Sequence, residues 1–433
     1  MHDLDTIVSL AKRRGFIFPG SEIYGGLAGT WDYGPLGLAL KNNIKNLWWR
    51  MFVEERDDVY GIDAAILMNS KIWEASGHVS GFSDPSVECD KCRHRFRADH
   101  VEGKGCPDCG GKLSEIKPFN MMFETQVGAV EDASSVSYLR PETAGGIFVN
   151  FKNILDTFHP TLPFGIAQIG KAFRNEIAPR DFIFRAREFE QMEIEYFVRH
   201  SEWEKYFEEW RQNILRYVEA VGIAKEAVHE LEVPDPDRAH YSKRTIDFEF
   251  DYPFGRKELY GLAYRTDFDL SAHETSSGAD MRYTDPETKE KFIPHVIEPS
   301  LGVDRTILAV LLSAYTEDEL GGEKRVFLKL KPAVAPIKVA VFPLVSNKEN
   351  IVNRAREIYL GLKKGFSAAF DDIGNIGKRY RRQDEIGTPW CVTVDYQTLE
   401  DGTVTVRDRD TGKQEREPAE DLDKYFQELL KSN

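Results

Sequence analysis

The stretch from Ala172 to Phe197 constrains the fold most, because polar and apolar residues alternate on both sides of a short polar segment. Alternation with a period of two is typical of a β-strand with one buried face. Pro179 lies in the middle of the polar segment, where a tight loop is expected. The stretch therefore predicts two antiparallel strands, the second of which begins at Phe184.

Charged residues run through both predicted strands, in the order Arg174, Glu176, Arg185, Arg187, Glu188, Glu193 and Glu195. Guanidinium and carboxylate groups are costly to bury unless they are paired or meet a charged ligand. An exposed hairpin with cross-strand ion pairs would also account for alternating charges. Such a hairpin does not explain the strings F-R-N-E, R-E-F and M-E-I-E, so we expect a site for a charged ligand.

The composition is that of an ordinary soluble protein, with 41% hydrophobic and 30% charged residues in a chain of 433. This length allows two or three domains. With a net charge of −15, a nucleic-acid partner would need a local cluster of Lys and Arg. The N-terminus predicts no secretory signal or transit peptide, and the longest apolar stretch, near Ile307–Ala314, is too short to cross a bilayer. We therefore expect a cytoplasmic protein without a membrane partner.

Four of the five cysteines form two C-x-x-C pairs, at Cys89, Cys92, Cys106 and Cys109. Pairs at this separation are typical of a tetrahedral Zn²⁺ site and fit metal binding better than a disulfide framework. Four thiolates close the coordination sphere, so the zinc would be structural and not catalytic. His94 and His100 could replace a cysteine as ligand, although we expect both on the surface. The zinc would fold a segment of about residues 84–118.

Three further segments carry recognisable strings. Residues 24–37 read Y-G-G-L-A-G-T-W-D-Y-G-P-L-G and lead into an amphipathic helix near Leu36, whose apolar stripe is wider than one core face needs. Residues 140–144 read R-P-E-T-A. A short strand at 296–298 leads through a turn into an apolar helix with the string G-V-D-R, which ends at Arg305.

The segment after the hairpin predicts a helix and then a loop-rich insertion. Ser201-x-x-Glu204 predicts a capping box, and the helix would end near Val221, before Gly222. Residues 222–245 contain P-D-P-D and few periodic apolar positions, so the insertion as a whole covers about residues 200–245. Alternation typical of strands resumes after it.

The C-terminal part predicts a separate α/β domain. Prolines in Lys331–Pro336 indicate a linker, and strand and helix patterns alternate after it up to a final helix from about Pro418. The densest basic cluster of the chain lies in this part, at Lys378, Arg379, Arg381 and Arg382. A solvated helix face would explain the cluster. Because Tyr380 interrupts the charges and the domain is close to neutral, we favour a contact with RNA.

These elements together resemble the class II aminoacyl-tRNA synthetases, and their strings are similar to those of the glycyl-tRNA synthetases. The G-P-L-G helix resembles motif 1, the F-R-N-E hairpin motif 2 and the G-V-D-R helix motif 3, in the family's order. R-P-E-T-A resembles the family string R-P-E-T-A-Q-G, with Gly145 here in place of Gln. The C-terminal part resembles the anticodon-binding domain of the glycyl, histidyl, threonyl and prolyl enzymes, so the resemblance covers almost the whole chain.

The resemblance implies an α/β protein with two domains. Residues 1–332 would form an α+β catalytic domain on an antiparallel sheet, with a zinc-binding insertion, and residues 336–433 an α/β anticodon-binding domain. The implied activity is ATP-dependent ligation of glycine to tRNA(Gly) through a glycyl-adenylate, with Mg²⁺ as cofactor and Zn²⁺ as structural metal. The motif 1 helix forms the dimer interface in that family, which implies a homodimer. The basic cluster at residues 378–382 would contact tRNA.

Roles of individual residues also follow from the resemblance. Arg174 would bridge the α-phosphate and the glycine carboxylate, and Arg305 would hold the far end of ATP, so these two are the expected catalytic residues. The ATP-binding positions are Arg174, Asn175, Glu176, Arg185, Phe189, Glu298 and Arg305, with Phe189 stacked on the adenine and Glu176 at its edge. Glu298 or Glu258 would bind Mg²⁺. The glycine-binding positions are Glu142, Arg174, Glu193, Glu298 and Ser300, whose carboxylates suit an ammonium group.

Three other interpretations remain open from the sequence. A synthetase for another amino acid of the same subclass is opposed by the strings R-P-E-T-A and E-P-S. A non-catalytic binding protein, like the DNA polymerase accessory subunits that resemble glycyl-tRNA synthetases, need not retain Arg174 and Arg305, but both are present. A zinc-ribbon nucleic-acid binder leaves most of the chain unexplained.

Overall fold

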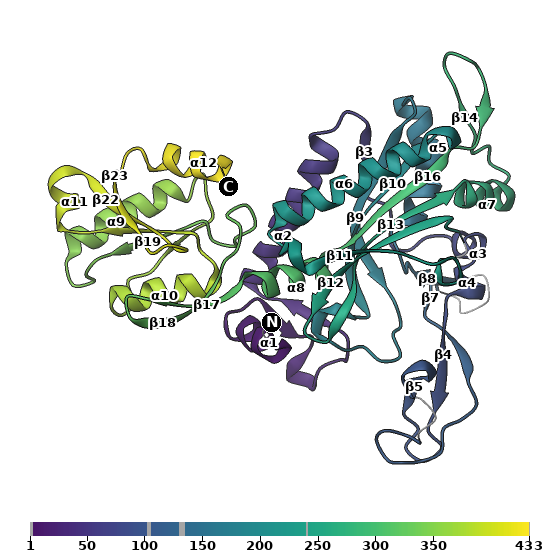
Figure 1. Cartoon of the computed structure of the whole chain (residues 1–433), viewed down its shortest axis with the longest axis horizontal. Helices are drawn as coiled ribbons and strands as arrows, with labels where there is room; N and C mark the ends of the chain where they lie inside the picture. The colour runs from purple at the N-terminus through teal and green to yellow at the C-terminus, as the bar shows by residue number, and fades with distance from the viewer. Residues whose placement is uncertain (1–2, 102–104, 130–134, 240, 433) are drawn as a thin grey trace.

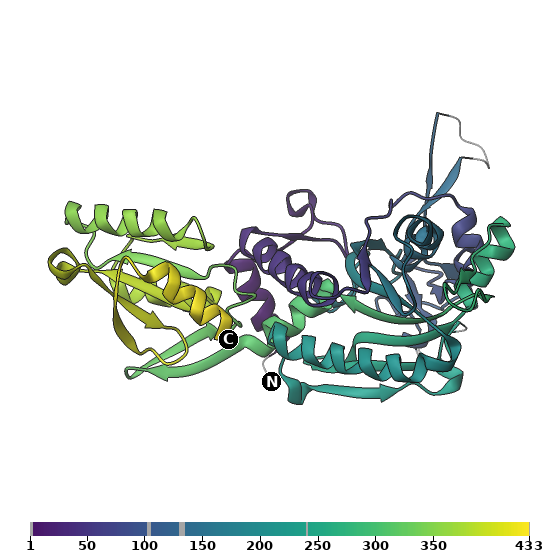
Figure 2. The same cartoon turned by 90° about the horizontal axis from the view of Figure 1, so that it is seen from above.

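The computed structural model describes residues 3–101, 105–129, 135–239 and 241–432. Figure 1 shows two units, a larger one whose colours run from purple through blue and teal to green, and a smaller one of light green and yellow C-terminal segments. In Figure 2 the two units lie end to end along the long axis of the molecule. The larger unit is built on a seven-stranded sheet and the smaller on a five-stranded sheet. This combination confirms the predicted fold class.

The sheet of the larger unit has the strand order β11-β12-β13-β16-β10-β9-β3. In that order its strands are Val228–Glu232, Arg244–Tyr252, Gly255–Thr266, His295–Gly302, Glu188–Val198, Phe164–Phe173 and Val59–Gly61. All neighbouring pairs are antiparallel except β3 and β9, which run parallel. The predicted strand at 296–298 is longer, since β16 runs on to Gly302 and helix α8 follows it directly.

Strands β9 and β10 form the predicted hairpin. They pair without interruption from Phe164 opposite Phe197 to Phe173 opposite Glu188. Residues 174–187 form the loop between them and contain the short 3-10 helix η4 (Phe182–Phe184). The strands are therefore present, but the second one begins later than predicted.

Four charged residues that the sequence placed in the strands lie in this loop instead: Arg174, Glu176, Arg185 and Arg187. Asp181 and Phe182 adopt left-handed φ angles of 59° and 58°, which end the extended conformation. Apolar and polar residues still alternate there because Ala186 is buried between the more exposed Arg185 and Arg187. Burial of a loop residue thus imitated the pattern of a strand.

The two faces of the sheet pack against different helices. Alternate residues of β10 from Met192 to Val198 lie in the main core, together with α2, α6 and α8. On the opposite face, Phe197 packs against Phe151 of α5 in a second cluster. Side chains alternate along a strand, so Glu193 and Glu195 share the α5 face. The carboxylates of the M-E-I-E string are thereby turned away from the main core.

The helices of the larger unit are α1 (Leu4–Arg13), α2 (Pro35–Trp49), α3 (Lys71–Ala75), α4 (His78–Gly81), α5 (Ala144–Phe158), α6 (Trp203–Val221), α7 (Phe268–Ser277) and α8 (Val303–Ala314). Short strands pair as β1 (Ile17–Pro19) with β2 (Trp31–Tyr33), β7 (Phe123–Gln126) with β8 (Val136–Leu139), β14 (Tyr283–Thr284) with β15 (Lys291–Phe292), and β17 (Tyr315–Leu320) with β18 (Glu323–Leu328). In α2, Trp48 is buried in the core, whereas Trp49 packs against Gly61. None of the helices in the described ranges is long and apolar enough to cross a membrane.

Helix α6 differs from its prediction at one end. It begins at Trp203, after the 3-10 turn η5 (His200–Glu202), and no side chain caps its first turn. The predicted capping box at Ser201 is therefore wrong, because the chain is already turning there. The helix ends at Val221, and Gly222 follows in the left-handed conformation with φ of 87°, as predicted.

Residues 200–245 are part of the core and of the sheet, although the sequence predicted a loop-rich insertion. Phe207, Trp210 and Tyr217 of α6 are buried in the main core. Strand β11 pairs along its whole length with β12 and forms one edge of the central sheet. The proline-rich part of the segment is limited to the loop between these two strands.

The predicted zinc segment forms a small three-stranded sheet in the order β5-β4-β6, with β4 (Ser83–Glu88), β5 (Arg95–Arg97) and β6 (Lys117–Asn120). Figure 1 shows this sheet projecting from the larger unit. Its two outer strands pair antiparallel with β4. The cysteines lie at the end of the projection, beyond β4 and β5.

The smaller unit has the strand order β20-β19-β21-β22-β23. Its strands are β19 (Val339–Pro343), β20 (Ala368–Phe370), β21 (Trp390–Val394), β22 (Thr403–Asp408) and β23 (Gln414–Pro418), and its helices are α9 (Glu349–Leu362), α10 (Ile376–Ile386), α11 (Tyr396–Asp401) and α12 (Leu422–Ser432). β19 pairs in parallel with β20 and β21, and the other pairs are antiparallel. This is the α/β pattern expected from the sequence.

The segment predicted as a linker, Lys331–Pro336, is packed and not free. Val334 is completely buried in the core of the larger unit. The ammonium group of Lys338 donates hydrogen bonds to three backbone carbonyls of this segment. Arg14, directly after α1 of the larger unit, pairs with Glu385 of α10 in the smaller unit. Arg325 of the β17–β18 hairpin, which lies beside α10 in Figure 1, forms a buried ion pair with Asp384 of that helix. The two units are thus joined by fixed contacts.

Candidate active site and zinc centre

A cavity of roughly 360 Å³ lies over strands β10, β13 and β16, beneath the loop at residues 174–187. It is lined by most of the residues singled out in the sequence, namely Glu142, Arg174, Glu176, Arg185, Phe189, Glu193, Glu258, Glu298, Ser300 and Arg305. Asn175 does not line it; its backbone N–H donates to the carbonyl of Met121 at 2.8 Å. Residues far apart in the sequence thus converge on one cavity.

The floor of the cavity is a set of carboxylates held by neighbouring strands. Glu193 on β10 lies opposite Ser300 on β16, whose hydroxyl donates to Glu193 Oε1 at 2.7 Å. The hydroxyl of Thr143 donates to the other oxygen of Glu193. Glu298, on β16, accepts a hydrogen bond of 2.7 Å from the buried guanidinium of Arg265. These contacts fix both carboxyl groups at the floor.

Arg265 is itself held in a single orientation. Its Nε and Nη2 donate to the two carboxylate oxygens of Asp269, each at 2.8 Å, in a fork that is completely buried. Its guanidinium also lies 3.7 Å from the ring centroid of Tyr241. Paired guanidinium groups of this kind resist reorientation. Arg265 is therefore a fixed support for Glu298.

Glu142 is held from the opposite side by His78. The imidazole Nε2 lies 3.4 Å from the Glu142 carboxylate, and Nδ1 lies 2.8 Å from the hydroxyl of Ser76. Burial alone would raise the pKa of Glu142, but His78 and nearby guanidinium groups outweigh burial and lower this pKa to about 2. Glu142 is thus a permanent anion in the cavity.

The pKa values of the other carboxyl groups of the floor are raised, in contrast to that of Glu142. Burial, together with neighbouring carboxylates, raises the pKa of Glu298 to about 8, even though Arg265 opposes the shift. Burial and the charge of Glu142 also raise the pKa of Glu193. Several neighbouring acids that are largely buried cannot all be ionised at neutral pH. The empty floor therefore binds protons that a cationic ligand can displace.

Glu195 lies beneath this floor. Its side chain is completely buried, and neither carboxyl oxygen has a hydrogen-bond partner among the described residues. Its oxygens lie within 4.8 Å of those of Glu193 and Glu298. Burial and the charge of Glu298 raise its pKa well above the ordinary value for a glutamic acid. Glu195 is therefore a neutral acid in the free protein.

Arginines form the wall on the side of the loop. Arg174 lies between two aromatic rings, with its guanidinium carbon 5.4 Å from the centroid of Phe82 and 5.2 Å from that of Phe189. Its Nε donates to the carbonyl of Pro141 at 3.1 Å. One face of Phe189 is therefore already covered by Arg174. Among the described residues, Pro141 is the one hydrogen-bond acceptor recorded for the guanidinium of Arg174.

Two more arginines complete this wall. Arg185 Nε donates to Glu176 at 2.7 Å, which holds together two residues of the loop. Arg305, in the first turn of α8, donates to the backbone carbonyl of Glu258 at 3.0 Å and lies 3.2 Å from its carboxylate. Arg305 lowers the pKa of Glu258, despite the effect of burial. One side of the cavity is thus cationic and the floor is acidic.

The segments that carry the three motif-like strings contact one another directly. The carboxylate of Glu190 on β10 pairs with Lys41 of α2 at 2.7 Å. The backbone N–H of Glu190 donates to Asp304 of α8 at 2.8 Å, and Asp304 also accepts from the hydroxyl of Tyr33 at 2.5 Å. Four side chains therefore hold α2, β10 and α8 in register.

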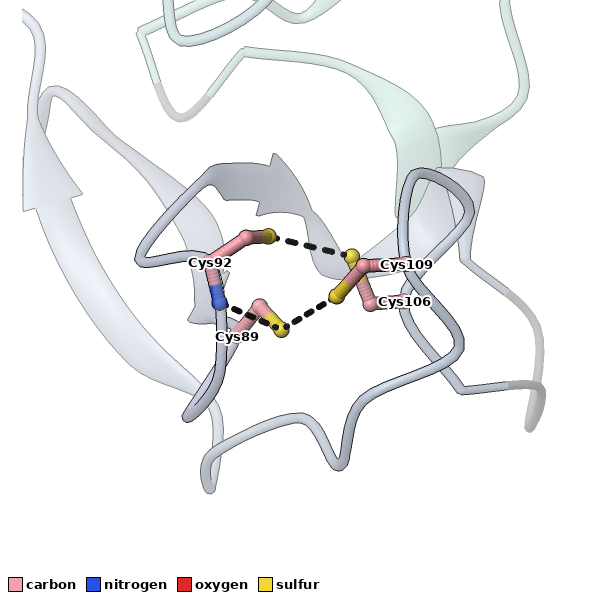
Figure 3. A group of neighbouring side chains, drawn as sticks. All are labelled: Cys89, Cys92, Cys106 and Cys109. Carbon is pink, nitrogen blue, oxygen red and sulfur yellow. Dashed lines mark hydrogen bonds between the residues drawn. The ribbon is translucent and has the colours of Figure 1, made fainter.

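The four cysteines of the predicted zinc segment converge, as Figure 3 shows. All four Sγ atoms lie within 4.8 Å of one another, and those of Cys89 and Cys109, and of Cys92 and Cys106, are 3.5 Å apart. A tetrahedral Zn²⁺ with bonds of about 2.3 Å requires sulfur atoms roughly 3.8 Å apart. The cluster therefore fits a zinc ion. His94 is exposed and bonded to Asp108, and the side chain of His100 lies outside the described residues.

The basic cluster of the smaller unit is not a single surface. Arg379 is buried, and its guanidinium donates to the backbone carbonyls of Pro343, Asp372 and Gly374, so its assignment to a surface contact is wrong. The other three members are Lys378, Arg381 and Arg382. Lys378 is exposed, while Arg381 and Arg382 are partly exposed and pair with Glu323 and Asp371.

Sequence reasoning missed the residues that orient the predicted ones. His78 lies in a turn-rich string, S-G-H-V-S-G, that carried no specific signal. Arg265 and Asp269 were visible, because they lie four residues apart in Y-R-T-D-F-D-L, a spacing that suits an ion pair. Asp304 is the acidic residue of G-V-D-R. Three of these four residues, all except His78, could therefore have been found in the sequence.

Comparison with known proteins agrees with this geometry. A family model described as "tRNA synthetase class II core domain (G, H, P, S and T)" matches residues 128–314, and one described as "Anticodon binding domain" matches residues 338–429. A glycine–tRNA ligase of Caldanaerobacter subterraneus subsp. tengcongensis is 52% identical, over 99% of this chain and 98% of that protein. The glycine–tRNA ligases of Lachnospira eligens and Thermobifida fusca are 51% and 50% identical, over 99% of this chain and 99% and 98% of theirs.

The chain belongs to the glycine–tRNA ligase family.

Membership of the glycine–tRNA ligase family decides between the interpretations left open by the sequence. A zinc-ribbon nucleic-acid binder is excluded, because the similarity extends over both units. The full-length relatives named here are glycine–tRNA ligases, and none is a ligase for another amino acid. Arg174 and Arg305 both line the cavity.

Proposed function

We propose that this protein ligates glycine to tRNA(Gly) with ATP, through a glycyl-adenylate formed in the cavity. The observation that carries the proposal is the division of this cavity into an acidic floor and a wall of arginines. The floor matches the ammonium group of an amino acid, and the wall matches its carboxylate and the phosphates of ATP. A cavity that offers both charges can bind the ammonium group of glycine while it aligns the glycine carboxylate with the phosphates of ATP.

Activation needs no general base, because the carboxylate of glycine is already ionised at neutral pH. The protein must instead align it with the α-phosphorus of ATP and neutralise the developing charge. Arg174 would do both, since it can hold one oxygen of each reactant with its unoccupied N–H groups. Phe82 and Phe189 support this role because they restrict the guanidinium from both sides.

ATP would lie along the arginine wall. The adenine would stack on the face of Phe189 that Arg174 leaves open, with Glu176 at its edge and Arg305 at the far phosphates. Arg185 would then hold Glu176 in place. Mg²⁺ would be held by Glu258 or Glu298, which both line the cavity, and when bound it would neutralise charge on the phosphate oxygens.

Glycine would be recognised by its ammonium group, since it has no side chain to bind. Glu142 supplies the fixed negative charge, and Glu193, Glu298 and Ser300 supply further acceptors. Rejection of alanine would come from the rigid floor, where the hydroxyls of Thr143 and Ser300 fix Glu193. A methyl group against fixed walls is costly, whereas a missing one is not.

The remaining proposals concern assembly and tRNA. We expect a homodimer through α2, where Leu38 is exposed on the outer face, and light scattering would test it. We expect the smaller unit to bind the anticodon region, with Lys378, Arg381 and Arg382 as candidate contacts after exclusion of Arg379. The zinc would be structural. A cytoplasmic location remains our expectation.

A charging assay with defined tRNA tests the proposed function. Purified protein should attach glycine to a tRNA(Gly) transcript in the presence of ATP, and should not charge an alanine tRNA transcript with alanine. Replacement of Arg174 by alanine should abolish charging without lowering the melting temperature by more than about 5 °C. Failure of the wild-type protein to charge tRNA(Gly), when its fold is intact, would reject the proposal.

A further inference from the structure

Asp84 connects the zinc segment to the loop at residues 174–187. It lies on β4, and only 8% of it is exposed. Its Oδ2 accepts hydrogen bonds from Arg97 of β5 and, at 3.4 Å, from Arg185 of the loop. Arg185 in turn donates to Glu176 at 2.7 Å. Two guanidinium and two carboxylate groups thus form one chain of ion pairs between two parts of the molecule.

The zinc segment fixes one end of this chain. Strands β4 and β5 pair with Ser86 opposite Arg97 and Glu88 opposite Arg95. The first cysteine follows immediately, and the backbone N–H of Cys89 donates to the carbonyl of His94 at 2.9 Å. The register that places Arg97 beside Asp84 therefore continues into the turn that contains the first pair of cysteines.

The backbone of the loop at the other end is held by Phe182 and Ile183, which are buried in the main core, whereas the described partners of the Arg185 side chain are Glu176 and Asp84. It is excluded from the ladder between β9 and β10, which ends at Phe173 opposite Glu188. Its remaining anchors include Arg187, which donates to the carbonyl of Ala28 at 2.7 Å and to that of Glu176 at 3.0 Å. Arg185 and Glu176 both line the cavity. The position of these two side chains thus depends strongly on Asp84.

We propose that Asp84 is a positioning residue through which the zinc-binding segment holds the ATP-binding loop. The inference rests on the proposed function, because it takes Arg185 and Glu176 as ATP contacts. A carboxylate shared by two arginines cancels their mutual repulsion and fixes the distance between β5 and the loop. Without it, Arg97 and Arg185 would repel each other and the loop would lose its contact with β4. The zinc segment thereby serves the first half-reaction as well as any contact with tRNA.

The test replaces Asp84 by asparagine, which keeps the shape and removes the charge. In glycine-dependent pyrophosphate exchange, the KM for ATP should rise about tenfold, while the KM for glycine stays within about twofold. The matched control is Asp99→Asn, because Asp99 is the other carboxylate paired with Arg97, at 2.9 Å, and does not reach the loop. This control should leave both constants unchanged. An unchanged KM for ATP in D84N, or equal rises for both substrates, would overturn the proposal.

Two further measurements separate this bridge from the proposed function and from simple misfolding. Limited trypsin digestion without substrates should cleave the D84N loop, at Arg180 or Arg187, at least about fivefold faster than the wild-type loop. Zinc content should remain one ion per chain. Arg97→Gln should reproduce the ATP effect if D84N fails to fold. If the wild-type protein shows no exchange, the proposed function fails, and equal digestion rates in D84N and wild type would overturn the bridge independently.

Discussion

Glycine should bind more tightly as the pH rises, by about tenfold between pH 6 and pH 7 and by about fivefold between pH 7 and pH 8. The reason is the acidic floor, where burial and neighbouring carboxylates raise the pKa of Glu298 to about 8. An ammonium group binds the ionised form of this carboxyl. For a pKa of about 8, roughly a tenth of Glu298 is ionised at pH 7 and about a hundredth at pH 6.

The sign follows from which state the ligand prefers. A raised pKa means that the free floor holds a proton through the neutral range, and the ammonium of glycine displaces it. Affinity is therefore lost as the pH falls below about 8 and levels off above it. Each pH unit below this pKa corresponds to a loss of about 1.4 kcal/mol in binding free energy. Glu142 does not contribute to the slope, because its pKa is about 2.

Isothermal titration of glycine at three pH values measures this slope directly. Repeating the titration in buffers with different heats of ionisation should show that about one proton is released per glycine. The KM for MgATP should follow a different pH profile, since Arg174, Arg185 and Arg305 keep their charge throughout this range and the titrating group nearest to Arg305 is Asp247, whose pKa is raised to about 7. Glycine affinity that is equal at pH 6 and pH 8, without proton release, would refute the reasoning.

Two variants locate the proton. Glu298→Gln should weaken glycine binding at pH 8 and remove most of the pH slope, because it replaces the titrating carboxylate. Glu195→Gln replaces an acid that is already neutral, so affinity at pH 7 should stay within about threefold of wild type. A loss of affinity in Glu195→Gln as large as that in Glu298→Gln would show that Glu195 is ionised and binds the ligand.

The remaining predictions concern the arginine wall, the zinc and the tRNA. Arg174→Ala should cost about 3–5 kcal/mol in pyrophosphate exchange at an unchanged melting temperature, and Arg174→Lys should not restore it, because a lysine cannot hold two oxygens in a fork. Cys106→Ser combined with Cys109→Ser should release zinc, as metal analysis would show. The same variant should raise the KM for ATP, as the Asp84 variant does. Zinc-free wild-type protein with normal activity would contradict this prediction. Lys378→Ala combined with Arg381→Ala should raise the KM for tRNA and leave pyrophosphate exchange unchanged. The dependence of the tRNA binding constant on salt concentration, plotted on logarithmic axes, should become shallower by about one for each lost phosphate contact. Unchanged charging would show that these residues are not part of the tRNA site.

The periodicity of the sequence predicted the framework well where one face of an element is buried. The β9–β10 hairpin, helix α2 after Pro35 and the end of α6 at Gly222 all follow from local signals. Local signals failed where burial came from elsewhere. The loop at residues 174–187 imitated a strand because Ala186 is buried between two arginines of the loop. The capping box at Ser201 did not form because a 3-10 turn already precedes the helix.

The cavity could be predicted only in part, for a similar reason. Residues in recognisable strings, such as Arg174 and Glu193, were assigned from their neighbours in the sequence. His78 and Asp84 act through Glu142 and Arg185, which lie 64 and 101 positions further along the sequence. A local sequence pattern does not record partners at such separations. Arg379 was wrongly assigned to a surface cluster because its neighbours in the sequence are also basic. Adjacent residues on a helix point to different sides, and the side chain of Arg379 is buried.

Amino-acid-dependent exchange between ATP and pyrophosphate tests the proposed chemistry most directly. The measurement needs only the protein, MgATP, labelled pyrophosphate and each of the standard amino acids in turn, without tRNA. Glycine should support exchange at least about a hundredfold faster than alanine or serine, and Arg174→Ala should abolish the signal. Exchange supported equally well by another amino acid, or by none in well-folded protein, would contradict the assignment of the acidic floor and the arginine wall.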